Sequence, residues 1–174
     1  MQKKSSDTYV PAEDTFFFED HIIRETGHSA LEIGTGSGYL ARVLEKNFEI
    51  VVGTDINYAS LRDAHMGNAV CCDGASALGC KFDLVICNLP YLPSDEVADR
   101  TTDGGPEGLL VPMRIVASAM PHVKQGGKML LLTSSLANYE KLIVEMEMNG
   151  FSVKILAKKN LFFEDLVLLS ATLL

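Results

Sequence analysis

The sequence predicts an α/β fold: a doubly wound, Rossmann-like, seven-stranded and mostly parallel sheet with helices on both faces. Apolar segments typical of buried strands alternate with segments of helical periodicity along most of the 174 residues. This alternation is typical of a parallel sheet that helices cover on both sides. The last two apolar segments, 152–158 and 166–173, are joined by too few residues for a parallel crossover. We therefore expect them to form an antiparallel C-terminal hairpin.

Five segments are predicted to be helices, because apolar side chains recur along each of them at helical spacing. Glycine follows three of these segments and marks their ends, and Pro106 stands at the first turn of another. In chain order, the predicted helices cover 16–26, 39–46, 58–66, a segment from Pro106 that carries Leu109, Leu110, Met113 and Val116, and 137–149.

Near-continuous apolar runs, most of them rich in Val, Ile and Leu, mark the strands between these helices. In chain order, the predicted strands cover 29–33, 49–54, 69–72, 82–87, 128–133, 152–158 and 166–173. A chain of this length fits one core. We therefore expect 1–174 to be a single domain, in which 1–28 form an N-terminal segment and a helix packed on the core.

The composition favours a protein or small-molecule substrate over a nucleic acid. The formal net charge is −8, and adjacent lysines occur only at 3–4 and 158–159, whereas nucleic-acid binders usually have a basic surface. Polar residues follow Lys3-Lys4 where a signal peptide would be apolar, and no apolar run reaches the length of a membrane span. We expect a soluble, cytoplasmic protein.

Cysteines 71, 72, 80 and 87 form no C-x-x-C pair, so we expect buried free thiols and no metal site.

A glycine-rich turn links the first predicted strand to the helix that follows it. In Leu31-Glu32-Ile33-Gly34-Thr35-Gly36-Ser37-Gly38, the missing side chains let a ligand approach the backbone, and the helix N-terminus adds free N–H groups. Gly36-x-Gly38-x-x-Ala41 also fits the dinucleotide fingerprint. The turn therefore predicts a nucleoside cofactor, and both NAD and S-adenosylmethionine fit it.

Two acidic residues follow the next predicted strands. Asp55 stands where a carboxylate would accept hydrogen bonds from ribose hydroxyls. Asp73 would lie close enough in a doubly wound sheet to accept a hydrogen bond from the amine of an adenine. With the glycine turn, they predict a nucleoside site at the carboxyl edge of the sheet.

Asn88-Leu89-Pro90-Tyr91 ends the strand 82–87 at the same predicted edge. Pro90 holds Leu89 extended, so the Leu89 carbonyl can stand beside the side-chain oxygen of Asn88. Two adjacent acceptors suit a planar –NH₂ group, and Tyr91 offers a ring face for it. A hydride-transfer enzyme has no obvious use for this arrangement. The motif therefore favours S-adenosylmethionine over NAD, and its four residues are the candidate catalytic residues.

Taken in order, these motifs resemble those of class I S-adenosylmethionine-dependent methyltransferases, and especially the amino-methylating branch with the motif Asn/Asp-x-Pro-Tyr/Phe. Residues 9–17 and 103–108 resemble segments of the release-factor glutamine methyltransferases, particularly the short archaeal and eukaryotic members. The usual tetrapeptide there is Asn-Pro-Pro-Tyr, and Leu89 replaces its first proline. The resemblance implies methylation of the glutamine amide in the Gly-Gly-Gln loop of a class 1 translation termination factor.

The resemblance also implies roles for individual residues. Thr15, Glu32 and Gly34 would contact the methionine portion of the cofactor and its surroundings. Asp55 would contact the ribose, and Asp73 would contact the adenine. Gly36, Gly38 and Asn88 would complete the cofactor site.

Two further expectations concern partners and alternatives. Relatives of this kind work with a small zinc-binding activator protein, and the short apolar strand 69–72 suits an edge that another chain covers; the zinc would belong to the partner.

Other acceptors remain open, namely an adenine or guanine base of a nucleic acid and a protein lysine. A non-catalytic nucleoside-binding subunit is the alternative from a different class.

Overall fold

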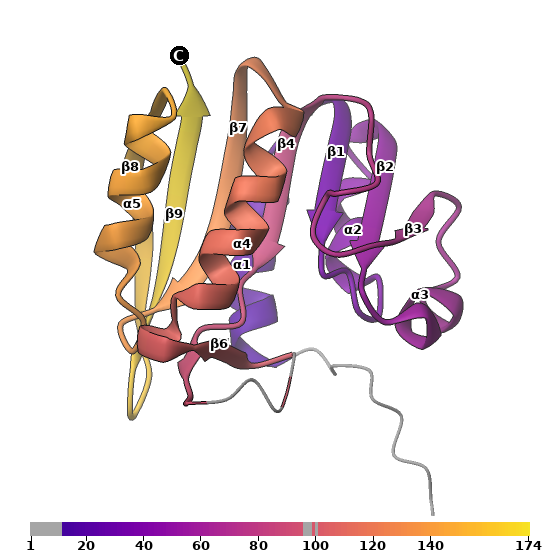
Figure 1. The fold of residues 1–174 in the computed structure, drawn as a ribbon. Helices are drawn as coiled ribbons and strands as arrows, with labels where there is room; N and C mark the ends of the chain where they lie inside the picture. Colours follow the sequence, from indigo (N-terminus) through magenta and orange to yellow (C-terminus); the bar gives the residue numbers. More distant parts are fainter. Residues whose placement is uncertain (1–11, 96–98, 100) are drawn as a thin grey trace, which may run out of the picture.

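The computed structural model describes residues 12–95, 99 and 101–174. Its main sheet has the strand order β3-β2-β1-β4-β7-β9-β8. All strands are parallel except β9, which runs antiparallel to both of its neighbours (Figure 1). The strands are β1 (Gly27–Ile33), β2 (Phe48–Asp55), β3 (Ala69–Cys71), β4 (Phe82–Asn88), β7 (Val123–Ser134), β8 (Phe151–Asn160) and β9 (Asp165–Leu173). The predicted fold and its C-terminal hairpin are confirmed.

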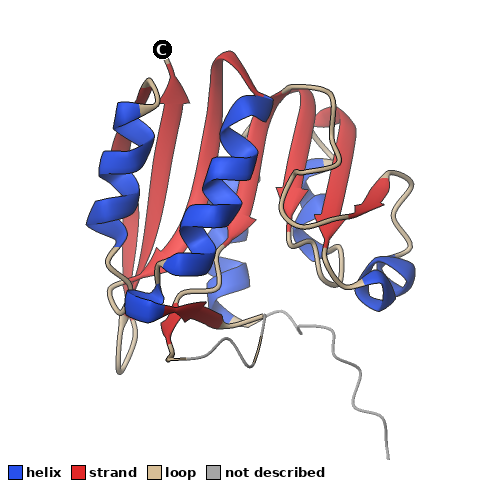
Figure 2. Ribbon diagram, in the orientation of Figure 1, coloured by secondary structure: helices blue, strands red, loops and turns tan. Residues whose placement is uncertain are grey.

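Helices cover both faces of this sheet. They are α1 (Glu13–Ile22), α2 (Tyr39–Leu44), α3 (Tyr58–Ala64), α4 (Leu110–Ala119) and α5 (Tyr139–Met148). Figures 1 and 2 show α4 and α5 in front of the sheet and α1 and α2 behind it. Successive strand residues point to opposite faces, so the strands contribute side chains to two separate hydrophobic cores.

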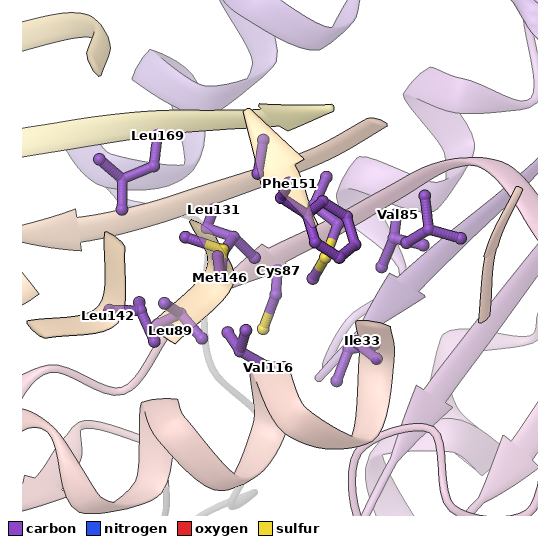
Figure 3. Close-up of a cluster of buried hydrophobic side chains, with 14 of the residues drawn as sticks. Ile33, Val85, Cys87, Leu89, Val116, Leu131, Leu142, Met146, Phe151 and Leu169 are labelled. Carbon is purple, nitrogen blue, oxygen red and sulfur yellow. The ribbon is translucent and has the colours of Figure 1, made fainter. Parts of the chain in front are cut away.

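One core lies under α4 and α5, where Val116 and Met146 meet strand residues such as Leu131 (Figure 3). The other lies under α1 and α2, where Phe18 packs with Leu40.

The first helix differs from the prediction. It begins at Glu13 and ends at Ile22, and it buries Thr15, Phe18 and Ile22 while Phe16 is 48% exposed. Acidic side chains in the first turn stabilise a helix N-terminus, which favours this earlier start. The chain must also turn before β1 begins at Gly27, so the helix cannot continue to 26. Positions 9–11 of the predicted N-terminal signature lie outside the described residues.

The region between β4 and α4 contains structure that the sequence did not predict. Two short parallel strands, β5 (Leu92–Pro93) and β6 (Asp103–Gly105), form a second small sheet. Pro106 begins a 3₁₀ turn, η1 (Pro106–Gly108), rather than α4 itself, and a second such turn, η2 (Met120–His122), follows α4. β7 begins at Val123 rather than Lys128, because a register shift against β4 accommodates the extra residues.

The expectation of buried cysteines is wrong for two of the four. All four thiols are free, but Cys71 and Cys80 are exposed, Cys72 is half-buried and only Cys87 is buried. Cys71 is exposed because β3 is short and lies at the edge of the sheet. Across the part of the chain that the structure describes, no helix has the length and hydropathy that a membrane crossing requires.

Candidate functional site

A cavity of about 1410 Å³ opens at the carboxyl ends of β1, β2 and β4. Ligands of doubly wound sheets bind at this edge, where parallel strands end together. β1 and β4 are neighbours, so the glycine turn and the end of β4 meet here as predicted. Most of the predicted site residues line the cavity: Thr15, Glu32, Gly34, Gly36, Asp55, Asp73, Asn88, Leu89, Pro90 and Tyr91.

The glycine turn leaves open space in front of its first two glycines. Gly34 and Gly36 have φ of +71° and +52°, a region that disfavours side chains. A Cβ atom on Gly34 would meet nothing within 4 Å, which leaves room for a ligand against the backbone. Gly38 differs, because a Cβ there would come within 3.3 Å of Arg42, Ala64 and Met66. The structure therefore packs Gly38 against the protein, outside the cavity lining.

The Asp55 carboxylate lies beside this turn and holds it in place. Its Oδ2 accepts the Gly36 N–H at 2.9 Å, and its Oδ1 accepts the Asn57 N–H at 2.8 Å. Tyr58, one residue further along, is 69% exposed and lines the same cavity. Tyr58 was not predicted as part of the site, although its position just after an acidic strand end was a usable signal. The ribose contact of Asp55 stays a prediction.

Asp73 reaches the cavity from the loop that follows β3. Its carboxylate pairs with the Arg114 guanidinium of α4 at 3.5 Å, and both residues line the cavity. The sequence offered no local signal for this partner, because Arg114 lies on a helix far along the chain.

Glu32 is a buried carboxyl group at the floor of the site, 4% exposed. Thr35 Oγ1 donates a hydrogen bond of 2.6 Å to its Oε2. Burial raises the pKa of Glu32 from 4.5 to about 8, although the bond from Thr35 acts in the opposite direction. The group is therefore largely protonated at neutral pH, and a cationic ligand beside it would favour its ionised form.

Asn88 lines the cavity, and the two polar atoms of its side-chain amide differ in their partners. Its Nδ2 donates to Asp14 Oδ2 at 2.8 Å, and this bond fixes the orientation of the amide. Its Oδ1 is buried and has no hydrogen-bond partner among the described residues. Leaving a buried acceptor unpaired costs about 1–3 kcal/mol, and such atoms are rare outside functional sites. Asp14, in the first turn of α1, was not predicted as part of the site.

The rest of the tetrapeptide is built into the protein. The Leu89 N–H donates to the Leu132 carbonyl at 2.9 Å, and the Leu89 side chain fills the core beneath α4 and α5 (Figure 3). Tyr91 is half-buried, and burial raises its pKa, with further contributions from the charge and hydrogen bond of Glu164. A Cβ on Gly108 would lie 2.2 Å from the Tyr91 carbonyl oxygen, so only glycine allows this close approach.

The sheet order, the antiparallel β9 and the acids around an open glycine turn define a Rossmann-like methyltransferase. Solved structures agree. The E. cuniculi Mtq2–Trm112 complex, responsible for methylation of the translation termination factor eRF1, matches with a TM-score of 0.83 and 27% identity, over 95% of this chain and 98% of that chain. The N-methyltransferase NodS from Bradyrhizobium japonicum, solved with S-adenosyl-L-homocysteine, has the same fold, with a TM-score of 0.67 and 12% identity over 92% of this chain and 87% of its own.

The chain belongs to the methyltransferase small domain family, whose sequence model matches residues 14–163. A Methanocaldococcus jannaschii protein described as a protein N5-glutamine methyltransferase is 30% identical over 97% of this chain and 93% of its own length. A release factor glutamine methyltransferase of Rhodospirillum rubrum is 32% identical over 67% of this chain, which spans 43% of that longer protein. The predicted membership of the methyltransferases is thus confirmed.

Proposed function

We propose that this protein transfers the methyl group of S-adenosylmethionine to the side-chain amide nitrogen of a glutamine, in the Gly-Gly-Gln loop of a class 1 translation termination factor. The observation that carries the proposal is the Asn88 amide. Its Nδ2 is tied to Asp14, and its buried Oδ1 faces no donor within the described residues. An acceptor held in this way suits a ligand –NH₂ group. The names of the similar proteins from M. jannaschii and R. rubrum support the same acceptor.

Two sets of residues line the cavity, one for the methyl donor and one for the methyl acceptor. On the donor side, Gly34 and Gly36 leave the open space, while Thr15, Glu32, Asp55 and Asp73 surround it. These residues and Asn88 would hold the cofactor; Gly38 would shape the turn from behind. When bound, S-adenosylmethionine supplies an electrophilic methyl group on a positively charged sulfur.

On the acceptor side, two oxygens would hold the glutamine amide. An amide nitrogen is a weak nucleophile, because its lone pair is delocalised into the carbonyl group. Asn88 Oδ1 and the Leu89 carbonyl would accept its two N–H groups, orient the nitrogen and favour positive charge on it during the transfer. Pro90 keeps that carbonyl in place. The Tyr91 ring would lie beside the space in front of these two oxygens, which we call the slot. Alignment and electrostatics, rather than a strong base, would supply most of the rate.

Two further parts of the proposal concern the organisation of the protein. The helix α1 would belong to the catalytic domain, since its Asp14 orients Asn88. A small activator protein would add to β3, which among the described residues has β2 as its single neighbour in the sheet and exposes Ala69 and Cys71. The structural neighbour Mtq2 was solved with Trm112, which supports such an arrangement. Zinc, if the activator needs it, would be held by that partner. A purified chain that is monodisperse and fully active alone would contradict the activator.

The acceptor is tested by methyl transfer from labelled S-adenosylmethionine to the termination factor of the same organism. We expect label on the wild-type factor and none on a factor in which the glutamine of the Gly-Gly-Gln loop is replaced by alanine. Equal label on both factors would refute the glutamine acceptor and leave lysine or another side chain.

A further inference from the structure

The tip of the β8–β9 hairpin carries two exposed aromatic rings. A backbone bond of 2.8 Å from the Leu161 N–H to the Glu164 carbonyl closes the turn. Between them, Phe162 and Phe163 are 92% and 86% exposed, the highest values for large hydrophobic side chains in the part of the chain that the structure describes. The two rings pack edge to face, with centroids 4.6 Å apart. They form one small apolar surface, which we call the phenylalanine tip.

The phenylalanine tip is anchored to the acceptor side of the cavity. Leu161, on one side of it, packs in the same apolar cluster as Tyr91. Glu164, on the other side, lies near enough for its charge to contribute to the raised pKa of the Tyr91 hydroxyl, which burial raises most. The following residue, Asp165, exchanges backbone and side-chain bonds with Ser135 at 2.8 and 2.9 Å. The tip therefore stands at the carboxyl edge of the sheet, where the β8–β9 hairpin ends (Figure 1).

An anchored pair of exposed aromatic rings is a typical element of a protein interface. Monomeric proteins rarely expose clustered large apolar side chains, whereas aromatic anchors contribute much of the affinity of protein–protein interfaces. The rings do not serve the chain's own core, since both lie almost entirely outside it. A partner is needed to bury them.

The charges around the phenylalanine tip indicate what kind of partner it takes. Glu164 and Asp165 follow the tip, Lys158 and Lys159 precede it on β8, and Glu13 lies 4.0 Å from the Lys159 ammonium, so the nearby charges are mixed. With a net charge of −8, the chain is repelled by anionic membranes and by a second copy of itself. These charges leave an apolar recess on another protein as the partner that fits the tip.

We propose that Phe162 and Phe163 dock the methyl-accepting protein, by inserting into an apolar recess near its acceptor loop. This inference rests on the proposed function, because it takes the acceptor to be part of a folded protein. The tip holds the body of the substrate while the acceptor side chain enters the slot at Asn88. Both contacts belong to one framework, since Leu161 packs on the same apolar cluster as Tyr91 and Asp165 is bonded to Ser135.

The first test is direct binding. The termination factor is titrated into the chain, together with its activator if the wild type requires one, in the presence of S-adenosylhomocysteine. Phe162→Ala with Phe163→Ala should raise the Kd for the factor by about 10-fold or more. The control carries Val144→Ala with Met148→Ala, two apolar side chains of α5 that are 53% and 71% exposed; its Kd should match that of the wild type. Both variants should bind S-adenosylhomocysteine normally.

The second test separates docking from chemistry. With the whole factor as substrate, the Phe162→Ala, Phe163→Ala variant should have a lower kcat/KM than the wild type, because its KM is higher. With a short peptide that contains Gly-Gly-Gln, its kcat/KM should equal that of the wild type. An unchanged Kd and KM for the factor would overturn the docking role, as would an equal loss on the peptide. An effect confined to anionic vesicle binding or to self-association would also overturn it. A wild type that does not methylate the factor would instead refute the proposed function.

Discussion

The two sides of the cavity are built in different ways. On the donor side, Glu32, Gly34 and Gly36 lie within one short segment, and the two glycines bond to Thr54 and Asp55 at the end of the neighbouring strand. On the acceptor side, Asn88 is oriented by Asp14, 74 residues away. Tyr91 likewise lies near Glu164 of the last hairpin, whose charge contributes to the raised pKa of the tyrosine. A local motif thus specifies the donor side, whereas the whole fold specifies the acceptor side.

The largest effect is expected from Asn88→Ala. Loss of one preorganised polar group at a reacting centre lowers kcat by about 100- to 1000-fold, and we expect a loss of this size in methyl transfer. The Kd for S-adenosylmethionine, measured by calorimetry, should change far less, because Asn88 is only one of several residues that would hold the cofactor. Residual turnover near the wild-type value would show that Asn88 does not hold the acceptor.

Gly108→Ala should damage the acceptor side through stability. Gly108 has a φ of +63°, and a Cβ there would lie 2.2 Å from the Tyr91 carbonyl oxygen. Left-handed strain and overpacking together cost about 2–4 kcal/mol of unfolding free energy. Urea unfolding measures this loss. An unfolding free energy close to that of the wild type would mean that the loop 103–108 shifts to accommodate the added methyl group without loss of stability.

Gly34→Ala should damage the donor side through affinity. Its Cβ would project into open space at a φ of +71°, where we expect the cofactor to bind. The Kd for S-adenosylmethionine should rise about 10-fold, which corresponds to about 1.4 kcal/mol. Gly126→Ala is a matched control, because Gly126 has a φ of +73° and equally open surroundings but does not line the cavity. Equal Kd values for the two variants would argue against a ligand at the glycine turn.

The smallest effect concerns the pH dependence of stability. Burial raises the pKa of Glu32 to about 8, from 4.5 in the unfolded chain. Between these values the folded state holds a proton that the unfolded state has released, so this group makes stability fall as pH rises. Glu32→Gln should therefore lose less unfolding free energy than the wild type between about pH 5 and pH 8. Identical pH profiles in urea titrations would contradict a raised pKa.

The difference between the two sides explains what the sequence could predict. Strand order and the terminal hairpin follow from alternation and from a short final connection, and the donor residues follow from motifs at strand ends. The first helix was placed in the wrong register, because Phe16, Phe17 and Phe18 are consecutive and do not by themselves select a buried face.

The missing site residues have a related explanation. Asp14 and Glu164 look like ordinary surface acids in the sequence, and only the packing of α1 and of the last hairpin brings them to β4. Gly38 fits a binding motif, yet its surroundings are set by side chains of α2 and of the segment after α3. Long-range packing of this kind has no signature in a short stretch of residues.

The central claim is that the Asn88 oxygen, held by Asp14, receives the amide of the acceptor. A crystal structure with S-adenosylhomocysteine and a peptide containing Gly-Gly-Gln tests it most directly. The account predicts the glutamine amide nitrogen within hydrogen-bond distance of Asn88 Oδ1, with Nδ2 still bound to Asp14. A glutamine bound elsewhere in the cavity, or an Asn88 amide turned to present Nδ2 to it, would contradict the claim.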